Sequence, residues 1–305
     1  MERHIAIAQI RPRKADYEAN LARIGDLFEQ VTRMTPPPDV LVLPETALSG
    51  YFLEGGVREI ARSRHVVFAD LQRTYRRRAP AGAAPLDVLV GFYEMDEGKC
   101  YNSGLYATLT VGDVGSVEAG VLHVHHKMFL PTYGVFDENR FVSKGRTIDV
   151  FDTRFGRASI LICEDVWHSM TSAVAALKGA QTLYVISASP GREFAGQNVG
   201  SLERWRLLLP GIASEHGLFV VYAGLVGFEG GKGFTGTSCV VSPWGEMVVS
   251  GPPLEECVVT ACIDDDDVAI ARTETPLISD LEAALPDLAL ELEAIARAPH
   301  VARSV

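Results

Sequence analysis

The sequence is poor in cysteine, in positive charge and in long apolar runs. Only five of its 305 residues are cysteine, and none of them forms a C-x-x-C pair. An odd number of widely spaced thiols argues against a disulfide scaffold and against a zinc ribbon. The cysteine usage instead fits a reducing compartment, so we expect a cytoplasmic protein.

Basic residues are also scarce. Lys and Arg number 28 against 39 Asp and Glu, which gives a net charge of −11. A nucleic-acid surface needs a basic patch that releases counterions, and an acidic chain is not drawn to a membrane surface. The charge balance therefore argues against nucleic-acid and membrane partners.

No apolar run is long enough to cross a membrane. The longest, residues 218–228, covers about half of the roughly 20 residues that a spanning helix needs. The opening MERHIAIAQI runs straight into a strand-like alternation without a signal-peptide pattern. Apolar residues still make up 47% of the chain, so a sizeable core can form. Without linkers, repeats or low-complexity tracts, we expect one domain over residues 1–305.

Apolar periodicity predicts an α/β fold of mixed sheets covered by helices. Residues 127–139 are turn-rich and separate two groups of strands. Helices are expected over residues 16–33, 57–77, 167–178 and 199–216, where Pro210 can kink the last, and in a C-terminal part interrupted by Pro276 and Pro286. Strands are expected over residues 4–10, 40–43, 87–92, 100–110, 118–125, 147–151, 158–162, 182–187, 218–223, 237–242, 247–250 and 257–263.

Polar side chains stand where three apolar strands stop. They are Glu45, Lys127 and Cys163, which offer a carboxylate, an amine and a thiol. Each also has an ordinary interpretation, as a surface acid or helix cap, a solvated lysine and a buried packing residue. Ligands of open α/β sheets gather at the carboxyl ends of strands, which favours a shared site.

Cys163 has the most distinctive surroundings. It ends an apolar strand and is followed by Glu164 and Asp165, and then by a helical pattern. A strand-to-helix elbow exposes a nucleophile and offers backbone N–H groups to an oxyanion. We interpret the other cysteines as packing residues within or beside apolar strands: Cys100, Cys239, Cys257 and Cys262.

Two histidines, His125 and His126, precede Lys127 and raise the question of a metal site. Adjacent residues on a strand point to opposite faces, so the two rings cannot easily share one ion. No third ligand follows at a suitable spacing. We therefore expect no metal at this place.

The three polar segments, in this order, resemble the signature segments of the carbon–nitrogen hydrolase family, also called the nitrilase superfamily. That family has a Glu in a P-E segment, a Lys in a K-x-x-L-P segment and a Cys in an I-C-E-D-x-W segment, matched here by residues 44–45, 127–131 and 162–167. Residues 5–9 and 236–246 resemble its first strand and a late strand-turn-strand. The resemblance covers nearly the whole chain and implies a four-layer αββα sandwich.

Residues 130–141 and 163–167 are most similar to the glutaminase domain of glutamine-dependent NAD synthetases. Those enzymes continue into an ATP-dependent domain with a Ser/Gly-rich pyrophosphate loop, for which this sequence has no counterpart. The resemblance therefore implies the amidase half alone. Nitrilases and N-carbamoyl amino-acid hydrolases use the same three residues, and an ammonia-delivering subunit of a separate synthetase is a further alternative.

The family chemistry implies a role for each matched residue. Cys163 would attack a small carboxamide, Glu45 would act as general base, and Lys127 would stabilise the oxyanion. A thioester intermediate would release ammonia and then the acid, without metal or organic cofactor. Glu138 matches a second glutamate of the family through F-D-E, although a solvated turn acid would look the same.

The substrate pocket is harder to derive from sequence, because aromatic residues also serve as ordinary core. Glu164 could pair with a substrate α-ammonium, with Asp165 as the competing assignment, and Ser189 or Arg192 could meet a substrate carboxylate or belong to an ordinary loop. The resemblance implies that the pocket is lined by Tyr51, Tyr133, Phe136 and Glu164. It also implies a homodimer or larger homo-oligomer through the helices expected at 167–178 and 199–216.

Overall fold

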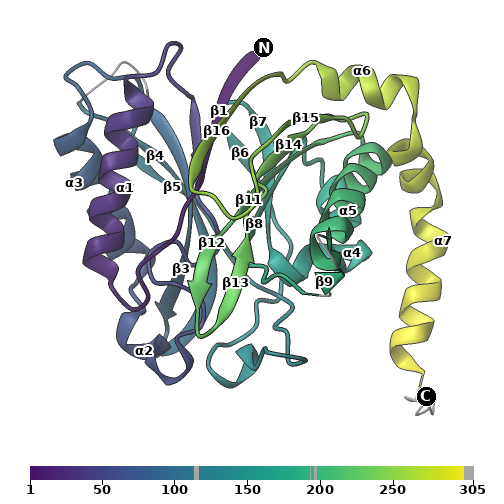
Figure 1. Ribbon diagram of the computed structural model, residues 1–305. Coiled ribbons are helices and arrows are strands. Elements are labelled where there is room, and N and C mark those ends of the chain that lie inside the picture. The colour runs from purple at the N-terminus through teal and green to yellow at the C-terminus, as the bar shows by residue number, and fades with distance from the viewer. Residues whose placement is uncertain (113–116, 193, 196–197, 299–305) are drawn as a thin grey trace.

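Two mixed β-sheets lie face to face, and helices cover the outer face of each (Figure 1). The computed structural model describes residues 1–112, 117–192, 194–195 and 198–298. Within these residues each of the two large sheets has six strands, in the orders β16-β1-β2-β3-β4-β5 and β15-β14-β11-β8-β7-β6. The layers run helix, sheet, sheet, helix, so the αββα sandwich expected from the sequence is confirmed.

The first sheet combines a parallel centre with an antiparallel meander. β1, β2 and β3 are parallel, whereas β16 pairs antiparallel with β1, and β3, β4 and β5 pair antiparallel in turn. Its strands are β16 (Cys257–Asp264), β1 (Glu2–Gln9), β2 (Val40–Val42), β3 (Leu86–Asp96), β4 (Lys99–Leu109) and β5 (Gly120–His126).

The second sheet has the same design, with β7, β8 and β11 parallel in its centre. Antiparallel strands β6 and β14 flank them, and β15 pairs with β14. Its strands are β15 (Met247–Ser250), β14 (Cys239–Val241), β11 (Phe219–Gly224), β8 (Thr182–Ser187), β7 (Gly156–Ile162) and β6 (Val150–Thr153).

Helices α1 and α3 cover the first sheet, and α4 and α5 cover the second (Figure 1). Short helical turns occupy the loops that follow β2, β5 and β7. The helices are α1 (Tyr17–Thr32), α2 (Val57–Ile60), α3 (Arg64–Arg78), α4 (Ser169–Leu177), α5 (Gly200–His216), α6 (Asp267–Glu274) and α7 (Leu277–Arg297), with 3₁₀ turns η1 (Glu54–Gly56), η2 (Glu138–Arg140) and η3 (Cys163–Trp167).

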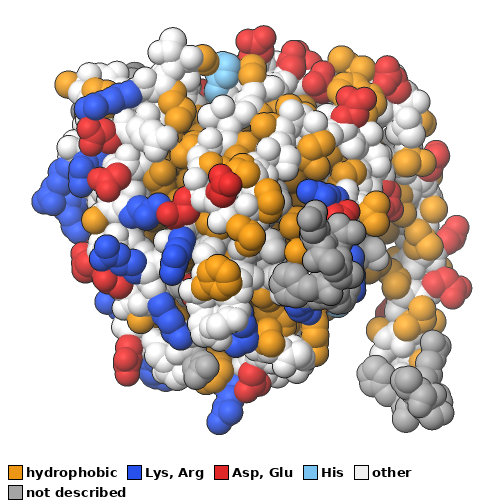
Figure 2. Space-filling model, in the orientation of Figure 1, with side chains coloured by type: hydrophobic (Ala, Val, Ile, Leu, Met, Phe, Trp, Pro, Cys, Tyr) orange, Lys and Arg blue, Asp and Glu red, His pale blue; other side chains and the backbone are white. Residues whose placement is uncertain are grey.

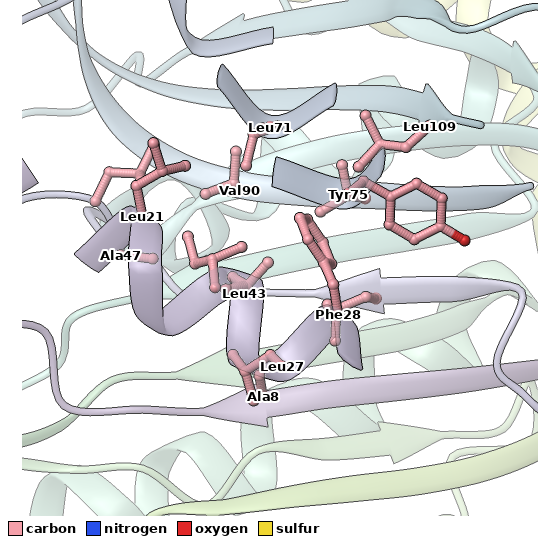
Figure 3. Close-up of a cluster of buried hydrophobic side chains, with 14 of the residues drawn as sticks. Ala8, Leu21, Leu27, Phe28, Leu43, Ala47, Leu71, Tyr75, Val90 and Leu109 are labelled. Atoms are coloured by element: carbon pink, nitrogen blue, oxygen red, sulfur yellow. The ribbon is translucent and has the colours of Figure 1, made fainter. Parts of the chain in front are cut away.

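Both faces of each central strand are buried, which explains why these strands are almost continuously apolar. In β1, Ala6 and Ala8 face α1 and α3, whereas Ile5 and Ile7 face the second sheet. Figure 3 shows part of the outer layer, in which Phe28 of α1 meets Tyr75 of α3 edge to face at 5.3 Å between ring centroids. This packing holds the strand ends, and the residues that follow them, in fixed positions.

Two helix predictions need correction. The helix expected at 57–77 is divided, because α2 ends at Ile60 and the Ser63 hydroxyl accepts a hydrogen bond from the Val66 amide to start α3. Pro286 lies inside α7 rather than interrupting it, whereas Pro276 directly precedes α7 as expected. Residues 282–298 are exposed, so water can satisfy the carbonyl that a proline leaves unpaired.

A hairpin of β12 (Val226–Glu229) and β13 (Lys232–Thr235) was not expected from the sequence. Its turn residues Gly230 and Gly231 have φ values of +55° and +77°, the left-handed region that favours glycine. The Gly-Gly pair was the available signal. The short strands β9 (Phe194–Ala195) and β10 (Asn198–Val199) were also missed.

The interpretation of all four remaining cysteines as packing residues is wrong for Cys262. Cys100 and Cys239 are buried, Cys257 is half-buried, and Cys262 is exposed on the last strand. Cys262 lies near the end of β16, where that strand pairs with the start of β1. Among the helices of the described ranges, none is long and apolar enough to span a membrane.

Candidate active site

The polar residues singled out in the sequence come from loops at the ends of strands in both sheets. Glu45 follows β2 and Lys127 follows β5 in the first sheet, and Cys163 follows β7 in the second. Glu45 and Lys127 are fully buried, and Cys163 is 8% exposed. The site therefore lies where the two sheets face each other, at the carboxyl ends of their parallel strands.

The Lys127 ammonium lies between two carboxylates. Its Nζ is 2.8 Å from Glu45 Oε1 and 2.7 Å from Glu138 Oε2. Asn102 of β4 donates through Nδ2 to the same two acids, at 2.8 Å to Glu45 and 2.6 Å to Glu138. The backbone amide of Ala188 donates to the other Glu45 oxygen at 2.6 Å. One cation and two neutral donors thus hold both carboxylates in fixed orientations.

Charge balance sets the protonation of this group. Burial alone would lower the pKa of Lys127, but the adjacent carboxylates of Glu138 and Glu45 outweigh it and raise that pKa well above its usual value. Burial raises the pKa of Glu138, against the effects of Lys127 and of the Asn102 hydrogen bond. The lysine is therefore an ammonium at neutral pH, and it supplies the positive charge of the site.

Cys163 occupies a strained elbow between β7 and η3. Its φ of +48° lies in the left-handed region, which side-chain-bearing residues rarely adopt. Burial raises the pKa of its thiol far above the usual value, and the Glu45 charge adds to this rise. The positive charge of Lys127 acts in the opposite direction. The thiol is thus protonated at rest, and Glu45 lies near enough for its charge to act on it.

Asp165 ties the nucleophile turn to the segment that carries the lysine. One of its carboxylate oxygens accepts from the amides of Met128 at 2.9 Å and Phe129 at 2.8 Å. The other accepts from the Ile162 amide at 3.0 Å and lies 3.0 Å from His125 Nε2. Asp165 is fully buried, so of the two acids after Cys163 it is the structural one.

The neighbouring histidines contact different acids. His125 pairs with Asp165, whereas His126 Nε2 lies 2.8 Å from Glu94 and its ring stacks on Tyr101 at 4.0 Å. The two rings therefore face different partners, as their adjacency on a strand predicts.

Aromatic side chains form one wall beside Glu138. The Tyr51 hydroxyl donates to Glu138 Oε2 at 3.1 Å, and the Tyr51 ring centroid lies 5.5 Å from Lys127 Nζ. Phe136 meets Tyr51 edge to face at 6.1 Å. A cavity of about 240 Å³ is lined by Tyr51, Phe136 and Glu138 together with Phe52. Neither Cys163 nor Glu45 is among its lining residues, so the cavity opens beside Glu138 rather than directly over the thiol.

The remaining candidates for substrate contact form a second group. The Tyr133 hydroxyl donates to both Glu164 oxygens, at 2.9 and 3.1 Å. The Arg192 guanidinium lies 5.7 Å from the Tyr133 ring centroid and 5.4 Å from that of Phe136. Ser189 is buried, and its hydroxyl accepts from the Trp205 indole at 3.0 Å, which ties it to α5. Of the two carboxylate-binding candidates, Arg192 is the more accessible.

Sequence reasoning missed several polar residues that organise this site. Besides Asn102, Tyr93 donates through its hydroxyl to the Tyr51 carbonyl at 2.8 Å. Glu229 of the unexpected hairpin accepts from the amides of Tyr51 at 2.9 Å and Phe52 at 3.0 Å. Asn102 had one signal in the sequence, a polar residue within an apolar strand, but strand periodicity does not reveal its partners.

One family of known proteins matches most of the chain. The family model described as carbon-nitrogen hydrolase matches residues 4–273. The chain belongs to the carbon–nitrogen hydrolase family. It is accordingly a hydrolase that acts on carbon–nitrogen bonds, and the family resemblance stated from the sequence is confirmed.

Relatives of this family member include both long and short proteins. The glutamine-dependent NAD(+) synthetase of Aquifex aeolicus is 28% identical over 266 residues, which cover 86% of this chain and 42% of the synthetase. This chain thus spans less than half the length of that relative. The 2-oxoglutaramate amidase of Bacillus subtilis is 26% identical, with 80% of this chain and 85% of the amidase covered.

A carbon-nitrogen hydrolase from Helicobacter pylori G27 has the same fold. Its crystal structure matches with a TM-score of 0.76 and covers 92% of this chain and 95% of the other, at 20% sequence identity. This likeness supports the four-layer architecture described above.

Proposed function

We propose that this carbon–nitrogen hydrolase is a cysteine-dependent amidase, which converts a small carboxamide to its acid and ammonia. The observation that carries the proposal is the Lys127 ammonium, held between Glu45 and Glu138 and acting on the buried Cys163 thiol. A protonated thiol is a weak nucleophile, so it needs an adjacent base and a nearby positive charge.

In the first half of the reaction Glu45 accepts the Cys163 proton, and the thiolate attacks the amide carbon. The negative charge that develops on the carbonyl oxygen is stabilised by Lys127 and by the backbone N–H of Glu164. Glu45 then returns its proton to the leaving nitrogen. The carbon–nitrogen bond breaks, ammonia departs, and the acyl group remains on Cys163 as a thioester.

In the second half a water molecule attacks the thioester carbon. Glu45 removes a proton from this water, while Glu138 holds Lys127 and positions the water. The carbon–sulfur bond breaks, the acid leaves, and the proton returns to the Cys163 sulfur. This chemistry needs no metal or organic cofactor.

The substrate we favour is an amide of glutamine-like character. Glu164 and Arg192 both lie against Tyr133, and they offer charges of opposite sign. A substrate α-ammonium could pair with Glu164, and an α-carboxylate could be bound in bidentate fashion by Arg192. The names of two relatives, a glutamine-dependent synthetase and a 2-oxoglutaramate amidase, support substrates of this size.

Ammonia release from a panel of amides, nitriles and N-carbamoyl amino acids tests the proposal. We expect the amides to be turned over, an acyl mass to remain on Cys163 in quenched reactions, and Cys163→Ala to be inactive. The matched control is Cys257→Ala, which removes a half-buried thiol of β16. Substantial amide hydrolysis by Cys163→Ala would disprove the nucleophile, and turnover of nitriles or carbamoyl compounds alone would favour those activities instead.

A separate synthetase could receive the ammonia. Co-purification with an ATP-dependent ligase would support a glutaminase subunit, whereas a homogeneous active homo-oligomer would support a free amidase. The single-domain extent of residues 1–305 and the cytoplasmic location stay predictions from the sequence.

We also propose that the protein forms a homodimer through α4, α5 and α7. In α7, Ile278 and Leu281 pack against the body, and apolar side chains continue at the same spacing beyond it. Spacings of three and four residues form one stripe on a helix. The exposed members of that stripe are Leu285, Leu288, Leu292 and Ile295. Figure 2 shows orange side chains along this helix, which stands away from the rest of the molecule in this view.

Burying that stripe against a second copy removes it from water, because a symmetric dimer brings the same patch of each chain together. Light scattering should give twice the 33.1 kDa chain mass or more at working concentration. Leu288→Glu should shift the protein toward monomer, whereas exchanging the exposed acid Glu291 for Gln should not. A wild-type mass of one chain would disprove the dimer.

A further inference from the structure

Three side chains that the reaction does not use lie together at one end of the first sheet. Glu2 and His4 are in β1, and Cys262 is in β16, where its partner in the antiparallel register is His4. Glu2 and His4 are two residues apart and therefore project from the same face of the strand. The carboxylate oxygen, the imidazole nitrogen and the thiol sulfur that they offer lie within 4.8 Å of one another.

This group is separate from the candidate active site. Glu45 follows β2 at the carboxyl end of the parallel strands, whereas Glu2 and His4 stand at the start of β1. From His4 to Gln9, at the far end of β1, the strand rises roughly 17 Å. Within the part of the chain that the structure describes, no other set of three His, Cys, Asp or Glu side chains gathers in this way.

We propose that Glu2, His4 and Cys262 bind one divalent transition-metal ion, for which zinc is the best fit. A thiolate, an imidazole and a carboxylate are the protein ligands that zinc prefers, and a tetrahedral ion with three of them keeps its fourth position for water. Ligand atoms about 2.0–2.3 Å from a common centre are roughly 3.5 Å apart. Glu2 and Cys262 are exposed and His4 is half-buried, so small side-chain rotations can close the present spacing.

The electrostatic surroundings favour a cation at this position. The Asp39 carboxylate accepts a hydrogen bond from the His4 amide at 2.8 Å, and Asp264 is the cross-strand partner of Glu2. Further acids follow in the turn after β16, and Figure 2 shows Asp and Glu side chains along the upper edge of the molecule. The N-terminal ammonium pairs with Asp264 and Asp266, and Arg3 pairs with Asp265. The negative charge that a divalent ion would offset is therefore mainly that of Glu2 and Asp39.

An ion bound at this position would also stabilise the fold. It would join the first strand of the chain to a strand 258 residues later (262 − 4), at the point where the two lie side by side. An ion that binds only the folded state stabilises it by mass action. At a free concentration 100 times its Kd, it shifts the folded-to-unfolded ratio about 100-fold.

Cobalt(II) is the probe that tests the ligand set, because a Co²⁺–thiolate bond gives a near-ultraviolet charge-transfer band. The titration is carried out in Cys163→Ala protein, so that the catalytic thiol cannot contribute. We expect one ion per chain, with intense visible bands of a tetrahedral site. Cys262→Ser should abolish the charge-transfer band, and His4→Gln and Glu2→Gln should each weaken binding by about tenfold or more. The control Cys257→Ser should leave the spectrum unchanged.

Thermal unfolding with Zn²⁺ gives a second readout. Zinc should raise the Tm of the Cys163→Ala protein and of its Cys257→Ser derivative, and it should not raise the Tm when Cys262 or His4 is replaced. Far-ultraviolet circular dichroism of each variant without metal checks that the fold is retained. A charge-transfer band that survives Cys262→Ser, a cobalt spectrum without a thiolate band, or equal zinc stabilisation of all variants would overturn the proposal.

Discussion

Replacing Asn102 by Leu should move the acid limb of the pH–rate profile to higher pH. Asn102 Nδ2 donates to Glu45 at 2.8 Å and to Glu138 at 2.6 Å, so the substitution removes a donor from both acids at once. Leucine has a similar volume, and the Asn102 Oδ1 that is lost with it is buried without a hydrogen-bond partner. The fold should therefore survive the change better than the chemistry.

The sign follows from the Glu138 carboxyl. Burial raises its pKa, and the hydrogen bond from Asn102 lowers it by stabilising the ionised form. Without that bond the pKa rises, and the carboxylate is protonated at a higher pH than in the wild type. A hydrogen bond to a charged group contributes about 1.5–3 kcal/mol, and 1.36 kcal/mol corresponds to one pKa unit. The acid limb should thus move up by about one to two pH units. At pH values on that limb, kcat/KM should fall about 10- to 100-fold.

The assay is the initial rate of ammonia release as a function of pH, with an amide that the wild type hydrolyses. Ser103→Ala is the matched control, because Ser103 is the next residue of β4 and donates to a different buried acid, Glu94, at 2.9 Å. It should lower stability without moving the acid limb. If Asn102→Leu keeps the wild-type fold by circular dichroism and its acid limb coincides with that of the wild type, the reasoning is refuted.

Lys127→Arg should reduce turnover nearly as much as Lys127→Ala, because a planar guanidinium cannot replace a compact ammonium between two carboxylates. Near-wild-type kcat in the Arg variant would show that charge alone suffices. Glu164→Gln should weaken glutamine-like substrates by about 1.5–3 kcal/mol in kcat/KM and spare neutral amides; an equal loss for both would make Glu164 structural. Gly91→Ala should lower both Tm and kcat, since its Cβ would come within 2.5 Å of the Pro44 carbonyl oxygen in the turn before Glu45. Gly120→Ala, whose Cβ meets open space, is the control, and equal behaviour of the two alanine variants would contradict this packing argument.

Features repeated along the chain were predictable from the sequence, and features made by single contacts were not. Continuous apolar strands and amphipathic helices predicted mixed sheets covered by helices, because burial on both faces of a sheet and on one face of a helix leaves a periodic pattern. The four-layer arrangement was implied by the family resemblance. The division of the helix at 57–77 depended on one serine cap, and the β12–β13 hairpin depended on two glycines. Pro286 was misread because an exposed helix tolerates a proline that a buried one would not.

In the active site, the positions of the three residues at strand ends indicated that they could lie close together, but not which side chains would form hydrogen bonds. Glu45, Lys127 and Cys163 stand at strand ends, which favoured a shared site, and the family resemblance implied that they act together. The hydrogen bonds that orient these residues join elements that are remote in sequence. The Asn102 amide, for example, bridges the carboxylates of Glu45 and Glu138. Asp165 and Glu164 are adjacent in sequence but have different surroundings, and only the backbone amides around Asp165 distinguish them.

Neither sheet alone contains the complete active site. The first sheet supplies Glu45, Asn102 and Lys127, and the second supplies Cys163 and the Ala188 amide that holds Glu45. The Ala188 amide donates to Glu45 across this boundary at 2.6 Å. A hydrogen bond of this kind is far less tolerant of sliding than an apolar interface, and a misplacement of about 1 Å can cost about 100-fold in rate. The rate of catalysis should therefore report how accurately the two sheets are docked. We expect activity to fade in mild denaturant while the strands themselves remain paired.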